Sequence, residues 1–282
     1  SPYIIAEIGV NHEGSMENAK LLIDLAKEGG ADAAKFQSYK ANTLASKNSP
    51  SYWDLTKENT KSQYELFKKY DSFNAKDYQS LSEYCRDKSI DFLSTPFDDE
   101  SIDFLDPLVP FFKIASADIT NIPFLKKIAS KNKPIIISTG ASTLSEIEIA
   151  LNTIKQINNS NAVLMHCILS YPTLDKDSNL SMISSLKRVF PDHIIGYSDH
   201  TLPDKNMTTL VSSYILGATV IEKHFTDNKK LPGNDHYHAM DVHDLRNFNE
   251  TLSKINLLLG QNDYKKPVEC EFQSRKNARR SI

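Results

Sequence analysis

The chain alternates eight times between a short run of β-branched and other apolar residues and a longer amphipathic stretch. This alternation is typical of βα units, in which a buried strand is followed by the helix that covers it. Helices are predicted over 16–28, 75–88, 122–131, 144–158, 180–190, 205–216 and 244–259, with a short crossover at 99–105. The strands are predicted at 3–9, 33–37, 91–96, 111–116, 134–140, 162–167, 193–199 and 218–224.

The predicted strands are apolar along most of their length, which indicates that both faces of the sheet are covered. Eight such units in about 260 residues are the number and size typical of a (β/α)8 TIM barrel. We therefore predict an α/β chain with a single barrel domain over residues 1–262. A doubly wound open sheet is the alternative, but the first strand-to-helix turn, GVNHEGS, lacks the dinucleotide-binding pattern G-x-G-x-x-G.

Two segments do not follow the alternation. Residues 42–70 form a long polar insertion after the second strand and contain Trp53, the one tryptophan of the chain. Insertions of this length are usually functional lids or disordered excursions. Residues 263–282 are rich in Lys and Arg without an apolar period, which predicts a C-terminal linker or arm.

Composition excludes several classes of function. With 33 basic and 36 acidic residues the net charge is only -3, so no broad field attracts nucleic acid or an anionic membrane. No run approaches the roughly 20 apolar residues that span a bilayer, and the N-terminus does not resemble a signal peptide, so we expect a cytoplasmic protein. The cysteines Cys85, Cys167 and Cys270 lack CxxC spacing, which argues against a disulfide framework or a thiolate zinc site.

Polar residues gather where the predicted strands end. In a barrel these carboxyl ends converge on one face, which is where barrel enzymes have their active sites. Folding alone does not explain the pattern, because an unpaired buried charge costs several kcal/mol. The residues are Glu7, Asn11 and His12, then Lys35 and Gln37, Ser94 and Thr95, Lys113 and Ser116, Ser138 and Thr139, His166, then Ser198, Asp199 and His200, and finally Glu222, Lys223 and His224.

Two lysines in this set, Lys35 and Lys113, lie within otherwise apolar strands. With nearby hydroxyl groups they predict a cationic, donor-rich cup that suits a phosphate and a carboxylate. Alternatively, each lysine forms an ion pair with a carboxylate of a neighbouring strand, since buried lysines are almost always paired. The hydroxyl groups belong to Thr95, Ser116, Ser138 and Ser198.

The histidines His200 and His224 end consecutive strands, so their imidazoles can approach each other. Two neutral imidazoles with carboxylate or water oxygens suit a divalent transition metal such as Mn, Co or Zn. Glu222 is a candidate ligand or a residue that orients one. His12, His236, His238 and Asp235 are further candidates, although the segment GNDHYHAMD has no standard zinc-finger spacing.

These motifs together resemble the sialic acid (N-acetylneuraminate) synthase family, which makes N-acetylneuraminate and related nonulosonates. The similarity runs from about Tyr3 to Met240, and the pair SDHT and EKHFT is highly specific. The matching segments, in family order, are AEIGVNHEGS, AAKFQ, STPFD, KIASADITN, IISTGAST, HC followed by YPT, IGYSDHTL, IEKHFTDN and PGNDH.

The resemblance implies a condensation of phosphoenolpyruvate with an amino-sugar aldehyde, either N-acetylmannosamine or a diacetamido relative. It implies a divalent metal, commonly Mn with Mg and Co as alternatives, held by His200 and His224 as a Lewis acid. The enol methylene attacks the aldehyde carbon, water adds at the oxocarbenium-like carbon, and phosphate leaves with C–O cleavage. The implied phosphoenolpyruvate ligands are Lys35, Thr95, Lys113, Ser116, Ser138 and Ser198, while Glu7, Tyr171, Glu222 and Asp235 surround the sugar and the reacting carbons.

Glu7 is assigned to handle the proton of the attacking water, with Asp118 as the competitor, because developing positive charge favours a nearby carboxylate.

The chain departs from the family pattern at three places. Ala117 and Asp118 replace Gly and Glu, Leu169 replaces an asparagine near the sugar, and the GNDHYHAMD loop substitutes Asn234 and adds His238. These changes touch the sugar side, so the identity of the acceptor stays open among sialate, legionaminate, pseudaminate and related precursors.

The resemblance also implies a homodimer and a small C-terminal antifreeze-like domain that caps the active site of a partner subunit. Residues 263–282 are expected to lead towards such a domain, which is not part of this sequence; without that cap we expect weak activity with near-normal metal binding. Three other functions are alternatives. A 3-deoxy-octulosonate or heptulosonate phosphate synthase needs a second cationic pocket, for which no strand-end pair of basic residues remains. A non-catalytic scaffold would be expected to lack His200, His224 or Lys113, and a metal hydrolase would not need phosphoenolpyruvate.

Overall fold

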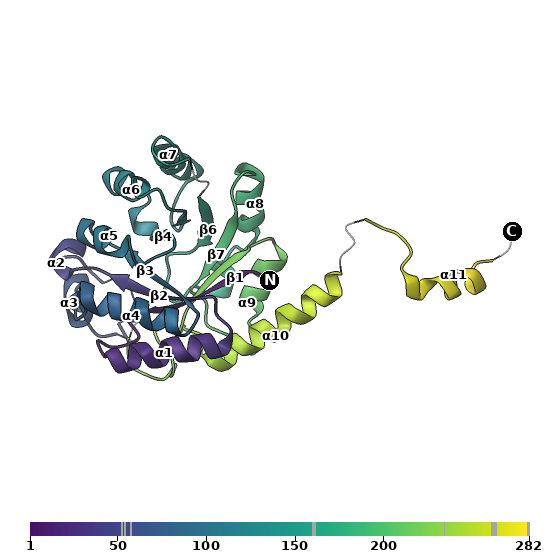
Figure 1. Ribbon diagram of the computed structural model, residues 1–282, viewed down its shortest axis with the longest axis horizontal. Coiled ribbons are helices and arrows are strands. Elements are labelled where there is room, and N and C mark those ends of the chain that lie inside the picture. The colour runs from purple at the N-terminus through teal and green to yellow at the C-terminus, as the bar shows by residue number, and fades with distance from the viewer. Residues whose placement is uncertain are drawn as a thin grey trace.

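The computed structural model describes residues 1–51, 53, 55–56, 58–159, 162–233, 235–260 and 264–280. Its eight strands are all parallel and follow the order β3-β2-β1-β8-β7-β6-β5-β4. The first and last strands of this order lie beside each other, so the sheet is a nearly closed barrel (Figure 1). The strands are β1 Tyr3–Gly9, β2 Ala33–Ser38, β3 Asp91–Pro96, β4 Phe112–Ile114, β5 Ile135–Ser138, β6 Val163–Cys167, β7 Ile195–Asp199 and β8 Val220–His224.

The (β/α)8 barrel predicted from the sequence is thus confirmed, and the open sheet is excluded. Helices surround the barrel in Figure 1, and each follows a strand. They are α1 Met16–Gly29, α4 Ala75–Asp87, α5 Asp99–Leu105, α6 Ile122–Ala129, α7 Leu144–Lys155, α8 Ser181–Val189, α9 Thr208–Ile215 and α10 Val242–Leu259.

The helix α1 illustrates how the sequence produces this layer. The Ser15 side chain caps the helix by accepting a hydrogen bond from Asn18 N, which satisfies one of the free amides of the first turn. The buried residues recur at the spacing of one helix face, which packs against the barrel. They are Ala19, Leu22, Ile23, Ala26 and Gly29.

The helix and strand boundaries differ from the predicted ranges by a few residues. The helix predicted to begin at Lys205 begins at Thr208, because Met207 has a left-handed φ of 50° that a helix cannot include. The fourth strand ends at Ile114 instead of continuing to residue 116. Beyond it, Ser116–Asp118 form a 3-10 turn over the carboxyl end of the barrel.

The polar insertion is ordered in its described part and contains α2 (Ala41–Leu44) and α3 (Gln63–Tyr70). Trp53 is buried there, and its indole nitrogen donates to the Thr60 carbonyl at 3.1 Å. Leu66 is buried as well, so the insertion has a small apolar interior of its own. The described part of this segment is therefore folded.

The C-terminal segment carries the 3-10 turn Glu269–Glu271 and the helix α11 (Phe272–Ala278), and all of its described residues from 264 to 280 are exposed. It lies apart from the barrel in Figure 1, as expected of an arm. The sequence had not predicted a helix there. The boundary proposed between residues 262 and 263 falls outside the described residues.

Across the described part of the chain, no helix has both the length and the apolar character needed to cross a membrane.

Candidate active site

A cavity of about 640 Å³ opens at the carboxyl ends of the strands. All of the residues to which the family resemblance assigns a role line this one cavity, although they come from all eight βα units. They are Glu7, Lys35, Thr95, Lys113, Ser116, Asp118, Ser138, Tyr171, Ser198, His200, Glu222, His224 and Asp235. The structure therefore brings these residues together in one place.

Two lysines and two carboxylates form the floor of the cavity. Lys35 forms an ion pair with Glu7 and lies 3.7 Å from the Glu222 carboxylate. Lys113 Nζ lies 3.4 Å from Glu222 Oε1. All four side chains are buried. The ion-pair alternative thus holds for both lysines, and each also lines the cavity.

The two carboxylates differ in their pKa. Burial raises the pKa of Glu7 to about 7, despite the attraction of Lys35. Burial acts in the same direction on Glu222, but Lys113 and Lys35 outweigh it and lower the pKa of Glu222 to about 2. At neutral pH Glu222 is therefore ionised, whereas Glu7 is near its midpoint and can accept or release a proton.

Hydroxyl groups surround the lysines. Lys35 Nζ donates to Thr95 Oγ1 at 3.0 Å, and Lys113 Nζ donates to Ser138 Oγ at 2.7 Å. Ser198 Oγ donates to Glu222 Oε1 at 3.0 Å. Ser116 Oγ, on the turn after β4, accepts a hydrogen bond from Gly140 N at 2.9 Å. The floor is therefore rich in donors that can turn towards an anion.

The histidines His200 and His224 lie side by side on the wall next to this floor, with ring centroids 5.5 Å apart. His200 Nδ1 is hydrogen-bonded to the Ile168 carbonyl at 2.9 Å, which orients the ring. Burial lowers the pKa of His200 to about 4 and that of His224 well below its usual value. Both imidazoles are therefore neutral at pH 7, the form that binds a metal.

Asp235 lies at the same wall, with Oδ2 at 3.8 Å from His224 Nδ1 and Oδ1 at 3.5 Å from His238 Nε2. His224 Nδ1 and both nitrogens of His238 are buried without a hydrogen-bond partner within the described residues. Such unsatisfied nitrogens fit a site that gains a further partner when it is filled. The described residues nevertheless include no group of three metal-binding side chains already gathered for one ion. The set fits a metal held by two imidazoles and completed by oxygens that the protein does not supply.

The part of the cavity lining that the insertion contributes was not predicted from the sequence. Side chains of the insertion line it together with Phe97, and most of them are apolar. The members from the insertion and its flanks are Tyr39, Leu44, Gln63, Leu66, Phe67 and Tyr70. A signal was present, because Leu66, Phe67 and Tyr70 share one face of an eight-residue helix, but the polar composition of residues 42–70 masked it.

Some of the polar strand-end residues do not line the cavity. Ser94 bonds to Ser38 at 2.7 Å, and His166 bonds to the Ser178 carbonyl at 2.8 Å. Asp199 and Lys223 pair with each other at 2.6 Å on the other side of the sheet. Successive side chains of a strand point to opposite faces, so only every second residue of a polar strand end reaches the cavity. The expectation that all of them converge on one site was therefore wrong for these residues.

The fold and the cavity define a class of protein, the (β/α)8-barrel enzyme with a polar active site at the carboxyl ends of its strands. Residues 22–264 match the model of the NeuB family. The N,N'-diacetyllegionaminic acid synthase of Legionella pneumophila is 42% identical over 99% of this chain and 79% of its own length. The human N-acetylneuraminate-9-phosphate synthase is 32% identical over 99% of this chain and 77% of its own length.

Among solved structures, the N-acetylneuraminic acid synthetase of Leptospira borgpetersenii in complex with citrate matches with a TM-score of 0.85 and 33% identity. That match covers 98% of this chain and 90% of the solved chain. The chain belongs to the NeuB family, and it is a phosphoenolpyruvate-dependent nonulosonic acid synthase of that family. The resemblance noted in the sequence motifs is thereby confirmed.

Proposed function

We propose that this cavity condenses phosphoenolpyruvate with an N-acetylated amino-sugar aldehyde to give a sialic-acid-type nonulosonate and inorganic phosphate. The observation that carries the proposal is the floor, where Lys35 and Lys113 lie among the hydroxyl groups of Thr95, Ser138 and Ser198. A phosphate and a carboxylate on one small molecule match two cations surrounded by donors.

Within this proposal, the lysines and hydroxyls hold phosphoenolpyruvate with its methylene carbon towards the histidine wall. Attack of that methylene on the aldehyde carbon forms the new C–C bond, breaks the C=O π bond so that the aldehyde oxygen takes up a proton from solvent, and leaves positive charge on the former enol carbon. Glu222 stabilises that charge, because the two lysines keep it ionised. Water then adds at this carbon, and phosphate leaves as its C–O bond breaks.

Glu7 accepts the proton of the attacking water. A group acting as a base at neutral pH works best with a pKa near 7, and burial gives Glu7 that value. Gln37 Nε2 donates to Glu7 Oε1 at 2.9 Å and orients the carboxylate. Asp118 is the competing base, since it lines the same cavity and its pKa is also raised by burial.

His200 and His224 are the residues that would hold a divalent metal, with Mn the first choice and Mg or Co the alternatives. A metal bound there would supply Lewis-acid polarisation of the aldehyde oxygen. Asp235 and Tyr171 line the same cavity and would contact the sugar. The ring of Tyr171 lies 4.3 Å from that of His200, centroid to centroid, so the tyrosine also limits the movement of this histidine.

For the acceptor we propose a diacetamido sugar in preference to N-acetylmannosamine. The part of the lining that the insertion contributes is largely apolar and includes Leu44, Leu66 and Phe67, and Leu169 also lines the cavity. An additional acetamido methyl finds apolar contacts there, and its amide can bond to the Tyr39 hydroxyl, which is buried without a hydrogen-bond partner among the described residues. The relative from Legionella, whose name specifies an N,N'-diacetylated product, is consistent with this choice.

The test is release of phosphate from phosphoenolpyruvate with a panel of acceptors, with and without Mn²⁺, and with product mass as the readout. We expect phosphate release only when phosphoenolpyruvate, an aldehyde sugar and Mn²⁺ are all present, and the highest kcat/KM with a diacetamido hexose. Leu169→Asn is expected to shift the preference towards N-acetylmannosamine. Phosphate release without any aldehyde, or turnover of a sugar without phosphoenolpyruvate, would contradict the proposed reaction.

A further inference from the structure

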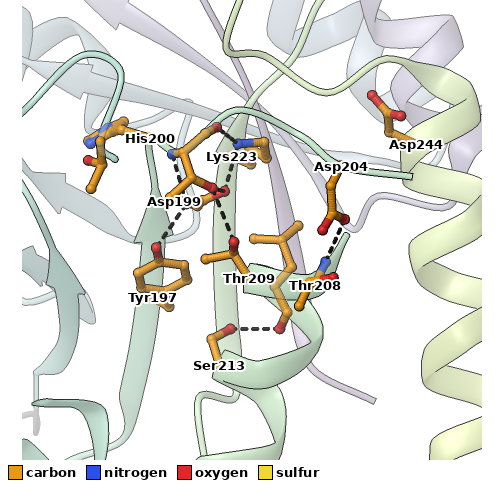
Figure 2. Close-up of polar contacts among 12 residues, drawn as sticks. Tyr197, Asp199, His200, Asp204, Thr208, Thr209, Ser213, Lys223 and Asp244 are labelled. Carbon is orange, nitrogen blue, oxygen red and sulfur yellow. Dashed lines mark hydrogen bonds and ion pairs between the residues drawn. The ribbon is translucent and has the colours of Figure 1, made fainter. Parts of the chain in front are cut away.

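A buried ion pair lies just behind the histidine wall, outside the cavity. Lys223 Nζ and Asp199 Oδ2 are 2.6 Å apart, and their side chains are only 0% and 1% exposed. Figure 2 shows them between the end of β7 and helix α9. Burying two charges costs several kcal/mol per ion before their attraction is counted, and apolar residues of similar volume often stabilise a fold as well or better. The pair is therefore not explained by stability alone.

The position of the pair in the sheet is informative. Asp199 on β7 is the direct ladder partner of Lys223 on β8, and the preceding partners are Ser198 and Glu222. Ser198 and Glu222 face the cavity and are hydrogen-bonded to each other, so Asp199 and Lys223 face the opposite side. Each member of the buried pair is followed in the chain by one histidine of the wall.

The same pair also holds the residue after His200. Asp199 Oδ1 accepts from Thr201 N at 3.0 Å, and Asp199 Oδ2 accepts from Thr201 Oγ1 at 3.1 Å. Lys223 Nζ donates to the Thr201 carbonyl at 2.7 Å. Asp199 and Thr201, the residues on either side of His200, both contact Lys223 Nζ. Lys223 itself immediately precedes His224 in the chain. The ammonium group connects the backbone of one histidine to the backbone of the other.

The Asp199 carboxylate is fully used by these contacts. Tyr197 OH donates to Oδ1 at 2.8 Å, so each carboxylate oxygen accepts two hydrogen bonds (Figure 2). A carboxylate has about four acceptor sites, and all of them are occupied. This saturation leaves the carboxylate a single orientation, which is the property required of a group that fixes its neighbours.

We propose that Asp199 and Lys223 are positioning residues that set the spacing of the His200 and His224 imidazoles. The proposal rests on the role of these histidines as metal ligands in the proposed function. Metal–ligand distances tolerate only a few tenths of an ångström, and the histidines have no direct hydrogen bond to each other among the described contacts. The ion pair supplies this link between them from outside the cavity.

The experiment measures Mn²⁺ binding to the whole chain by electron paramagnetic resonance of the free ion, without substrate. The double variant Asp199→Asn/Lys223→Met removes both charges and keeps the side-chain volumes. We expect it to fold, judged by circular dichroism and cooperative unfolding, and to bind Mn²⁺ about 10- to 100-fold more weakly, the usual effect of losing a group that orients a ligand. The single variant Lys223→Arg retains the positive charge and the hydrogen-bond donors, and we expect it to keep most of the wild-type affinity for Mn²⁺. A folded double variant with an Mn²⁺ Kd within twofold of wild type overturns the proposal.

A matched pair of threonine variants keeps the test decisive if the double variant does not fold. Thr201→Val removes one hydroxyl hydrogen bond to Asp199. Thr209→Val removes a hydroxyl that lies 3.3 Å from Thr201 Oγ1, and it leaves the ion pair intact. We expect at least a threefold weaker Kd for Thr201→Val and no change for Thr209→Val. Equal affinity of both variants and wild type overturns the proposal.

Two further measurements separate this proposal from the proposed function. His200→Ala that still binds Mn²⁺ normally would refute the ligand assignment itself. If His200→Ala loses Mn²⁺ while the ion-pair variants retain it, only the positioning role fails. At saturating Mn²⁺, the ion-pair variants should keep the phosphoenolpyruvate KM within twofold of wild type, a result that a general loss of structure would not produce.

Discussion

Replacing Lys113 by methionine tests the anion-binding floor most directly. Methionine has a similar length and volume but no charge, and Lys113 contacts Ser138 Oγ at 2.7 Å and Glu222 Oε1 at 3.4 Å. One lost charge-assisted hydrogen bond to phosphoenolpyruvate corresponds to about 1.5–3 kcal/mol. Since each 1.4 kcal/mol is about a factor of ten, the KM for phosphoenolpyruvate should rise about 10- to 150-fold.

The same substitution has a calculable effect on stability. The attraction between Lys113 and Glu222 at 3.4 Å is about 5 kcal/mol at an effective dielectric constant of about 20. Removing the ammonium also removes its cost of burial, and Glu222 keeps Lys35 at 3.7 Å and the Ser198 hydroxyl. We therefore expect the free energy of unfolding to fall by about 2–3 kcal/mol, less than for a pair with no second cation.

The assay is steady-state release of phosphate with phosphoenolpyruvate varied, accompanied by urea unfolding and Mn²⁺ binding. Lys131→Met is the matched control. It removes the same charge from an ion pair with Asp103 at 2.8 Å, at the opposite, amino-terminal end of the barrel. This control should leave the KM unchanged and cost less than about 1 kcal/mol. A KM for Lys113→Met within twofold of wild type, with Mn²⁺ still bound, would refute the assignment of Lys113 to the substrate.

His200→Ala and His224→Ala should each abolish retention of Mn²⁺ on a desalting column, whereas Lys113→Met should retain it; metal retained in both histidine variants would disprove the ligand assignment. Glu7→Gln should lower kcat about 10²- to 10⁴-fold without raising the KM for phosphoenolpyruvate, because the floor loses a negative charge while the base is removed; a change in KM alone would shift the role of base to Asp118. Folded Glu7 binds its proton more tightly than the unfolded chain does, so stability from this residue falls as pH rises from about 4.5 to about 7. Urea unfolding across that range should show wild type losing stability relative to Glu7→Gln, and a constant difference would disprove the raised pKa.

Much of this fold was predictable because strands and helices leave local marks. The apolar runs located all eight strands, and Asp99–Leu105, the shortest predicted crossover, is a helix in the structure. Boundaries were less predictable, since they depend on single backbone conformations such as the left-handed φ of Met207. The helices of the insertion were missed because their few apolar side chains are surrounded by polar ones, and only contact with the cavity shows their purpose.

The residues of the site were predictable for a related reason. The carboxyl ends of parallel strands meet at one face of any barrel, so polar groups such as Lys35, Ser198 and His224 could be assigned to a common cavity before their positions were known. Their partners could not be assigned. Glu222 was a candidate metal ligand, yet its carboxylate lies between Lys35 and Lys113 and accepts a hydrogen bond from Ser198.

The sequence by itself determined the barrel, the chemical groups at the ends of its strands and the family motifs, because each depends on residues close together in the chain. Only the tertiary structure decided which groups meet. The register of β7 and β8 places Asp199 opposite Lys223 and turns this pair away from the cavity, although the residues on either side in sequence face it. Register arises from pairing between strands distant in sequence, and a shift of one residue would move every side chain to the other face.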